Sequence, residues 1–258
     1  MNTKVGKRRS RYWLTSVAVC VVAPLIAFLM IWSDACSPGS RNAVNSDDAA
    51  ATTSSTPAPP ASANAVNNAT ESVPTSLADT GEYGENVYDY AKANDWNSAN
   101  LKLEALRESA KDVRTNVKNQ SDAMDSLDDH VAALGLAVAV KDRQTAMREA
   151  NQVTLDVANM STAYKLSVPV EVIRLDYYGR ELEIWTDAKD ANNLQATARE
   201  MRGTWDSLRT SVKSRSATEA KKFEALVAQV ESARAPSDYA SVATLVLNEV
   251  DNLEKLFH

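Results

Sequence analysis

The chain has 258 residues, a formal net charge of −6, two histidines and two cysteines. All 34 acidic residues but only 23 of the 28 basic ones follow residue 33, so this part carries a formal charge of −11. Such an acidic chain repels nucleic acid, which we do not expect as a partner. Because Cys20 and Cys36 both lie near the N-terminus, no disulfide is expected in the folded part.

The first 32 residues have the pattern of a membrane-targeting segment. Residues 1–13 contain five basic residues and no acidic one, and residues 14–31 contain no charge. These 18 uncharged residues would span about 27 Å as a helix, close to the hydrocarbon thickness of a bilayer. We therefore predict a basic cytoplasmic tail over 1–13 and a transmembrane anchor or signal segment over 14–32.

Three fates of this segment are compatible with its sequence. It is retained as an anchor, or it is cleaved as a signal peptide after the small residues Ser33 and Ala35, or Cys36 is lipidated after cleavage. Ala35-Cys36 fits a bacterial lipobox, whereas Ser33 and Asp34 are unusual in one. In each case we expect the C-terminal domain to be extracytoplasmic, in the periplasm or at the cell surface, with the membrane as a partner of the N-terminal segment.

A low-complexity segment follows. Residues 37–80 are mostly Ala, Ser, Thr, Asn, Asp and Pro, and contain no aromatic side chain. Such a composition buries too little apolar area to offset the entropy lost on ordering. We predict a disordered linker over residues 33–82.

Helical periodicity begins after Gly81 and continues to the C-terminus. Only three glycines occur between residues 85 and 258, and there are no alternating strand-like runs, so we predict an all-α fold. Asp95, Asp142 and Asp190 are predicted N-caps. The predicted helices are 83–94, 96–118, 121–139, 142–163, 169–188, 190–213, 217–234 and 236–257.

Two helical stripes share the same spacing. Residues 99, 103, 106, 110, 113 and 117 are apolar, and so are residues 194, 198, 201, 205, 208 and 212, which lie 95 positions later. The recurrence indicates a duplicated antiparallel bundle, with units of about four helices at 83–163 and 164–258. The alternative is that any two amphipathic helices match at such spacing.

Few residues suggest chemistry. Asp125, Asp129 and His130 could ligate a metal, but the signal is weak and a solvated acidic helix face is the favoured explanation. A b-type haem could use His130 with Met124, Met147 or Met201, but no Cys-x-x-Cys-His motif is present. We find no hydrolase or phosphate-loop motif and expect neither a cofactor nor an enzyme. A metal- or haem-binding bundle, or an enzyme whose site is not visible in sequence, remains the alternative.

The segment 169–185 mixes aromatic, basic and acidic residues between the two predicted units. Leu175, Tyr178, Leu182 and Trp185 follow helical core spacing. Arg174, Tyr177 and Arg180 are then the best candidates for a surface that contacts a protein or a small ligand.

Three local patterns resemble small membrane-anchored bacterial helical proteins of unknown function: Asp95-Trp96-x-x-Ala99, Asp128-Asp129-His130 and Lys141-Asp142. The resemblance covers about residues 85 to 160 and implies no activity. From these observations together we expect a membrane-tethered, extracytoplasmic helical bundle that acts by binding or scaffolding.

Overall fold

The computed structural model describes residues 71–117 and 120–258, and this part of the chain is all-helical, as predicted. The predictions for the basic tail, the anchor or signal segment, Cys36 and most of the linker lie outside the described residues. The helices are α1 (Thr75–Lys92), α2 (Trp96–Asn116), α3 (Ser121–Ala139), α4 (Arg143–Ser161), α5 (Val170–Ala188), α6 (Ala191–Arg215), α7 (Ala217–Ser232) and α8 (Pro236–Lys255). In the described ranges, no helix combines the length and the apolar character that a membrane span requires.

Helices α2 to α8 begin and end within two residues of the predicted positions, but the prediction for α1 was wrong. This helix begins at Thr75, where a linker to residue 82 and a helix start at 83 were expected. Leu77 and Ala78 are buried, so the first turns of α1 belong to the core. Gly81, in the predicted linker, and Gly84, in the predicted helix, are both buried within α1. A Cβ at Gly84 would lie 3.1 Å from Val153 Cγ1 on α4, so this glycine permits close helix packing.

The connections α1–α2 and α5–α6 have the same geometry. Asn94 and Lys189 each adopt a left-handed backbone conformation with φ of 56°. The next residue in each case is an N-cap aspartate: Asp95 accepts a hydrogen bond from the amide of Ser98, and Asp190 accepts from the amides of Asn192 and Asn193. Hydrogen bonds from the side chain and amide of Ser98 lower the pKa of Asp95, and those from the amide and side chain of Asn193 lower the pKa of Asp190.

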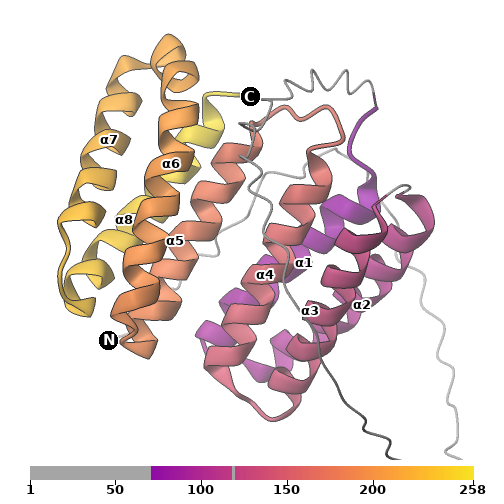
Figure 1. Cartoon of the computed structure of the whole chain (residues 1–258). Coiled ribbons are helices and arrows are strands. Elements are labelled where there is room, and N and C mark those ends of the chain that lie inside the picture. The colour runs from indigo at the N-terminus through magenta and orange to yellow at the C-terminus, as the bar shows by residue number, and fades with distance from the viewer. Residues whose placement is uncertain (1–70, 118–119) are drawn as a thin grey trace, which may run out of the picture. The chain divides into compact units, whose positions relative to one another are not determined.

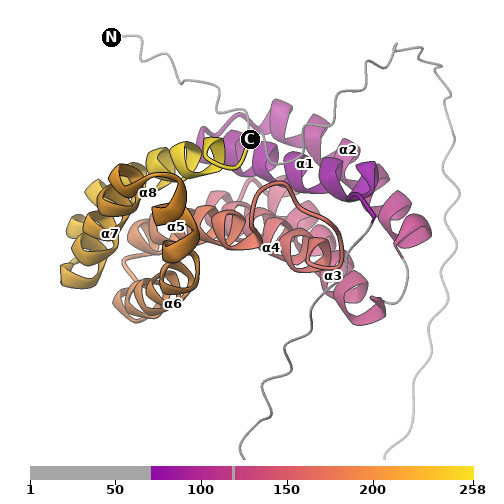
Figure 2. The same cartoon turned by 90° about the horizontal axis from the view of Figure 1, so that it is seen from above.

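The helices form two groups, visible in Figure 1 and from above in Figure 2. In the first, α1 packs against α2 and α4, and α3 packs against α2 and α4. In the second, α5 packs against α6 and α8, and α7 packs against α6 and α8. The two groups are in contact through α4 and α5.

Each group has its own hydrophobic core. The first contains Tyr88, and the second contains Trp205, which is 0% exposed and lies 4.8 Å from Phe223 between ring centroids. Trp185 is partly buried against both cores. Helix α5 therefore presents apolar residues in two directions: Leu175 and Leu182 to the second core, and Ile184 to the first.

Gly179 on α5 has the same relation to α8 that Gly84 on α1 has to α4. A Cβ at Gly179 would lie 2.5 Å from Leu247 Cδ2, so α5 also approaches its neighbour through a glycine. The two glycines are 95 positions apart. The close approach of the first and fourth helices of each group thus depends on a glycine at the same relative position.

Candidate functional site

Arg180 was predicted to be on a contact surface, and this prediction was wrong, because only 6% of the residue is exposed. Its Nη2 atom lies 2.7 Å from Asp176 Oδ2 and 3.4 Å from Glu85 Oε2 on α1. The guanidinium also lies over the ring of Tyr88, 5.4 Å from the centroid. Burial lowers the pKa of Arg180, but the neighbouring carboxylates outweigh burial and raise it overall. Arg180 is therefore a buried, charged link between α1 and α5.

Tyr177 and Arg174 also make contacts with α4. The Tyr177 hydroxyl accepts a hydrogen bond from Gln152 Nε2 at 2.8 Å, and burial raises its pKa. Arg174 donates to Asn159 Oδ1 at 3.0 Å in an exposed position. The three predicted residues thus lie along the side of α5 that meets the first helical group; Arg174 and Tyr177 are half-buried and Arg180 is buried.

Glu181 and Asn151 were not predicted as site residues, yet they are buried at the centre of this contact. Asn151 Nδ2 donates to Glu181 Oε1 and to the carbonyl of Tyr177, both at 3.2 Å. Trp185 Nε1 donates to Glu181 Oε2. Burial raises the pKa of Glu181 despite these hydrogen bonds. The i,i+4 spacing of Glu181 and Trp185 is visible in the sequence and permits this hydrogen bond. The sequence does not show that Glu181 is buried; only the fold does.

Glu183 makes a second link between α1 and α5. Its Oε2 atom accepts hydrogen bonds from the Tyr88 hydroxyl at 2.9 Å and from Lys92 Nζ at 2.6 Å. Arg143 at the start of α4 pairs with Asp187 near the end of α5. The two helical groups are therefore joined by a polar and charged interface, which we call the α1/α4–α5 interface.

The three predicted metal-ligating candidates do not converge. Asp125 pairs with Arg114 on α2 at 3.1 Å, and Asp129 is exposed. His130 instead approaches α4: its Nδ1 atom is 2.8 Å from Glu149 Oε2, and its Nε2 atom is 4.0 Å from Asp156 Oδ2. Within residues 71–117 and 120–258, no group of three His, Cys, Asp or Glu side chains has the geometry of a metal site.

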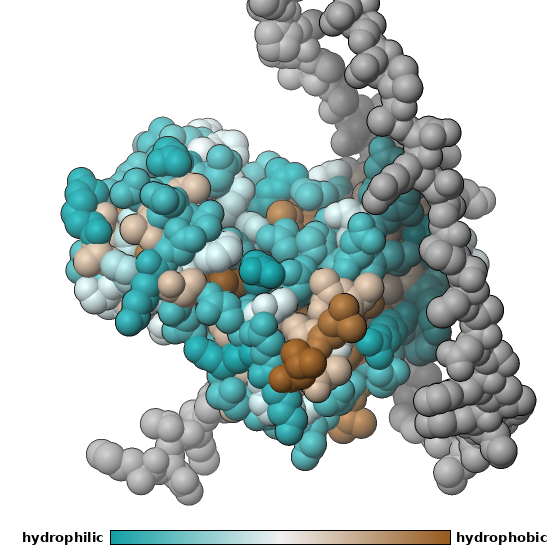
Figure 3. All heavy atoms as spheres, turned by 60° about the horizontal axis from the view of Figure 1, so that its bottom comes forward, coloured by the Kyte–Doolittle hydropathy of each residue, from teal (hydrophilic) through white to brown (hydrophobic). Residues whose placement is uncertain are grey.

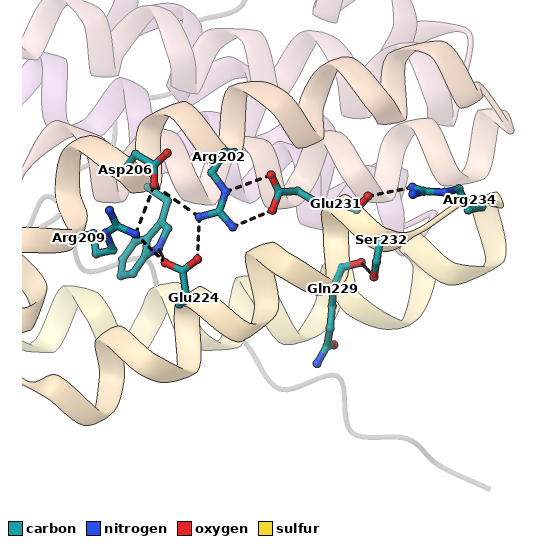
Figure 4. Close-up of polar contacts among 9 residues, drawn as sticks. Arg202, Asp206, Arg209, Glu224, Gln229, Glu231, Ser232 and Arg234 are labelled. Carbon is teal, nitrogen blue, oxygen red and sulfur yellow. Dashed lines mark hydrogen bonds and ion pairs between the residues drawn. The ribbon is translucent and has the colours of Figure 1, made fainter.

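Across α6 and α7, the side chain of Arg202 is held by acidic residues of the neighbouring helix (Figure 4). It makes two bonds to Glu231, at 3.1 and 2.7 Å, and one to Glu224 at 2.8 Å. Glu224 also accepts from Trp205 Nε1 at 2.8 Å and from Arg209 at 3.4 Å. This network joins the exposed edges of α6 and α7 directly above the Trp205 side chain.

The contact between α2 and α3 repeats one part of this network. Arg114 pairs with Asp128 across α2 and α3, as Arg209 pairs with Glu224 across α6 and α7. Arg107 lies 95 positions before Arg202, but a different residue faces it. Its guanidinium lies over Gly135, 2.1 Å from where a Cβ would be, and it pairs with Glu104 on its own helix.

Three large hydrophobic side chains of the first helical group are mostly exposed. Leu101, Leu136 and Val140 are 74%, 74% and 76% exposed. Leu136 and Val140 are one helical turn apart on the same face of α3, and we call these two residues the α3 apolar patch. Leu101 lies on the outer face of α2, opposite the buried Ala99 and Leu103. Figure 3 shows hydrophobic residues gathered on one face of the described part of the chain.

The second helical group lacks this feature at the corresponding positions. Ala196 stands where Leu101 does, and Ser232 and Pro236 stand where Leu136 and Val140 do, counted with the offset of 95 residues for α2 and 96 for α3. A bundle with the same helix contacts therefore folds without large apolar residues at this place.

No family model, curated protein or solved structure is significantly similar to this chain.

Proposed function

We propose that this protein is a membrane-tethered, extracytoplasmic helical scaffold that binds a partner through its first helical group. The apolar segment 14–32, with basic residues before it, would attach it to the membrane. Residues 33–70 would provide the tether, and the helices would form the binding domain.

The scaffold, in this proposal, arose by duplication of a four-helix unit. Four pairs of features at an offset of 95 or 96 residues support this: the glycines 84 and 179, the left-handed residues 94 and 189, the N-caps 95 and 190, and the ion pairs 114–128 and 209–224. Amphipathic periodicity alone does not account for equal turn geometry, equal caps and equal ion pairs, which favours duplication over the alternative of chance similarity.

The support for a binding role comes from one observation, the α3 apolar patch of Leu136 and Val140. Leucine and valine side chains that are three-quarters exposed and grouped on one face are typical of interaction surfaces. The α1/α4–α5 interface supports the scaffold part of the proposal, because buried hydrogen bonds such as those of Asn151 and Glu181 restrict how two bodies pack.

Cell fractionation tests the tether. The full chain is expected in the membrane fraction, with residues 71–258 accessible to protease from the extracytoplasmic side. The mass of the mature N-terminus separates a retained anchor, a cleaved signal peptide and lipidation at Cys36. A full-length chain recovered from the soluble cytoplasmic fraction would refute the proposal.

A further inference from the structure

We propose that the basic end of α6 and α7 docks on the anionic lipid headgroups of the membrane to which the chain is attached. We call this end, residues 209–222, the α6–α7 basic tip. The proposal rests on the membrane tether proposed above. It deepens that proposal by assigning the face of the helical domain that contacts the lipid.

The α6–α7 basic tip has a charge opposite to that of the chain as a whole. Residues 209–222 contain five basic residues and one acidic one, a formal charge of +4, whereas the chain after residue 33 carries −11. All five basic residues are exposed: Arg209, Lys213, Arg215, Lys221 and Lys222. Such a local positive field attracts an anionic surface even though the net charge of the chain is negative.

The fold does not require this charge. With the offsets of 95 residues for α6 and 96 for α7, the corresponding segment of the first helical group is 114–126, which has two basic and two acidic residues. Asp125 stands there at the position of Lys221. The same helix contacts, including the ion pair of Arg114 with Asp128, therefore form without a positive tip.

The helix dipoles account for only part of the charge. Lys213 and Arg215 lie in the last turn of α6, where positive side chains are favourable. Lys221 and Lys222 lie near the N-terminal end of α7, where the helix dipole does not favour them. Within the described residues, Lys213 and Lys221 form no ion pair, and Lys222 pairs with Glu219 on its own helix. The amines of Lys213 and Lys221 are therefore available to an external anion.

The two arginines of the tip have weaker partners. Arg209 lies 3.4 Å from Glu224 on α7, in an exposed pair that contributes little. The guanidinium of Arg215 lies over the ring of Phe257, 4.3 Å from the centroid. Because the ring is neutral, the charge of Arg215 adds to the positive field of the two lysines.

The tip lies at the end of the domain where the tether enters. The amide of Lys165 donates to the carbonyl of Glu71 at 2.9 Å, so the first described residues lie beside the connection that leads into α5. Helices α5 and α6 are antiparallel, and the side chains of Tyr178 and Thr204 meet across them, so the start of α5 is level with about Val212. Figure 1 shows the α6–α7 connection at the same end of the helices as the start of α1. The α6–α7 basic tip therefore lies at the end of the domain that the tether would hold near the lipid.

The composition of the tip favours adsorption to headgroups over insertion. Apart from the buried Val212 and Ala220, the residues between the basic ones are Ser, Thr, Ala and Glu. The attraction is therefore electrostatic: each basic residue near an anionic surface strengthens association about fivefold, and salt weakens it. A flexible tether over residues 33–70 would keep the tip within about 35 Å of the lipid, so weak adsorption suffices.

The test reconstitutes the full chain in vesicles of neutral phosphatidylcholine and in vesicles with about 30% phosphatidylglycerol. Flotation first measures attachment. A neutral acylating reagent then labels lysines, and peptide mapping gives the extent at each. Lys213, Lys221 and Lys222 should be labelled at least about threefold less in the anionic vesicles, and about 0.5 M NaCl should remove this protection. Lys189, exposed at the end of α5, is the internal control and should be labelled equally in both.

Variants assign the protection to the tip. The double change Lys221→Glu and Lys222→Glu should remove the protection of Lys213 and leave flotation unchanged. Lys141→Glu with Arg199→Glu alters the net charge equally at exposed sites outside the tip and should keep the protection. If the charge reversal impairs folding, Lys221→Gln with Lys222→Gln replaces it and should weaken the protection of Lys213.

Equal labelling of the three lysines in neutral and anionic vesicles would overturn the proposal. Protection that persists in high salt, or that the control variant also loses, would overturn it as well. Protection by added polyglutamate but not by anionic vesicles would assign the tip to an acidic protein instead. A chain that does not float with neutral vesicles contradicts the proposed tether, whereas flotation without protection contradicts only the docking of the tip.

Discussion

Glu85 of α1 and Arg180 of α5 form an ion pair, and they occupy equivalent positions of the proposed repeat because 95 residues separate them. Tyr88 and Glu183, which form a hydrogen bond, are separated by the same number. Helices α1 and α5 thus present the same positions to each other, with an acid facing a base in one pair and a phenol facing a carboxylate in the other.

Removal of Arg180 should strongly destabilise the protein. Arg180→Met removes the guanidinium that pairs with the buried carboxylates of Asp176 and Glu85, which costs about 3–5 kcal/mol in the free energy of unfolding. Denaturant titration measures this loss. Arg174→Met, which removes one exposed hydrogen bond, is the control and should change stability by less than about 1 kcal/mol. Equal effects of the two changes would contradict the buried position of Arg180.

Trp205 should be the most important single side chain of the second core. It is fully buried against Phe223, so Trp205→Ala should lower the free energy of unfolding by about 3–5 kcal/mol. Trp205→Phe keeps most of the buried area but loses the hydrogen bond to Glu224, and should cost much less. A small thermal shift for the alanine variant would place this side chain outside the core.

Glycine-to-alanine changes should have opposite effects on stability at Gly203 and Gly179. Gly203 is exposed on α6 with no atom within 4 Å of a Cβ, so Gly203→Ala should stabilise the protein by about 0.5–1 kcal/mol. Gly179→Ala places a Cβ against Leu247 and should destabilise it. Melting temperatures of the two variants decide the matter, and a stabilising Gly179→Ala would argue against the close packing of α5 on α8.

Asp156 should make stability depend on pH. Burial raises the pKa of Asp156 above its ordinary value of 3.8. The folded protein therefore gains stability from the protonated carboxyl group below pH 3.8. This stability is lost as the pH rises through the folded-state pKa, because the carboxylate is then charged and buried. One of its oxygens is buried with no hydrogen-bond partner. Asp156→Asn removes the charge and should raise the melting temperature at pH 7 to 8.

At pH 3 to 3.5 the same change should have little effect, because the wild-type carboxyl group is then protonated. Ser126→Ala, which removes the hydroxyl that donates to Asp156, is a useful comparison and should lower stability at neutral pH. A stabilisation by Asp156→Asn that is equal at both pH values would contradict the role assigned to burial of the charge.

The sequence was sufficient for those parts of the fold that local interactions determine. Asp95 and Asp190 cap their helices through amides two or three residues away, and the apolar stripes through Leu103 and Met201 are buried, as their spacing predicts. Helix α1 was predicted too short because residues 75–82 continue the low-complexity composition of the linker, whereas packing buries Leu77 and Ala78.

The candidate site was less predictable because it depends on contacts between segments far apart in the chain. Arg180 and Glu181 have the residue types of an exposed helix face, and only the packing of α5 against α1 and α4 buries them. Leu136 has the opposite character: its type indicates the core, and the seam between α2 and α3 leaves it exposed. On α5, the periodicity of apolar residues does not show that Arg180 and Glu181 are buried, because this helix is buried on two sides.

The arrangement of the two helical groups is tested most directly by zero-length carbodiimide cross-linking of the full chain, followed by peptide mapping. Lys92 Nζ and Glu183 Oε2 are 2.6 Å apart, and Lys92 is accessible, so an amide bond between them should be a major long-range product. It should be absent from Glu183→Gln, while the local product between Lys222 and Glu219 persists. Recovery of the local product without any Lys92–Glu183 cross-link in the wild-type chain would contradict the joining of α1 to α5 on which the scaffold depends.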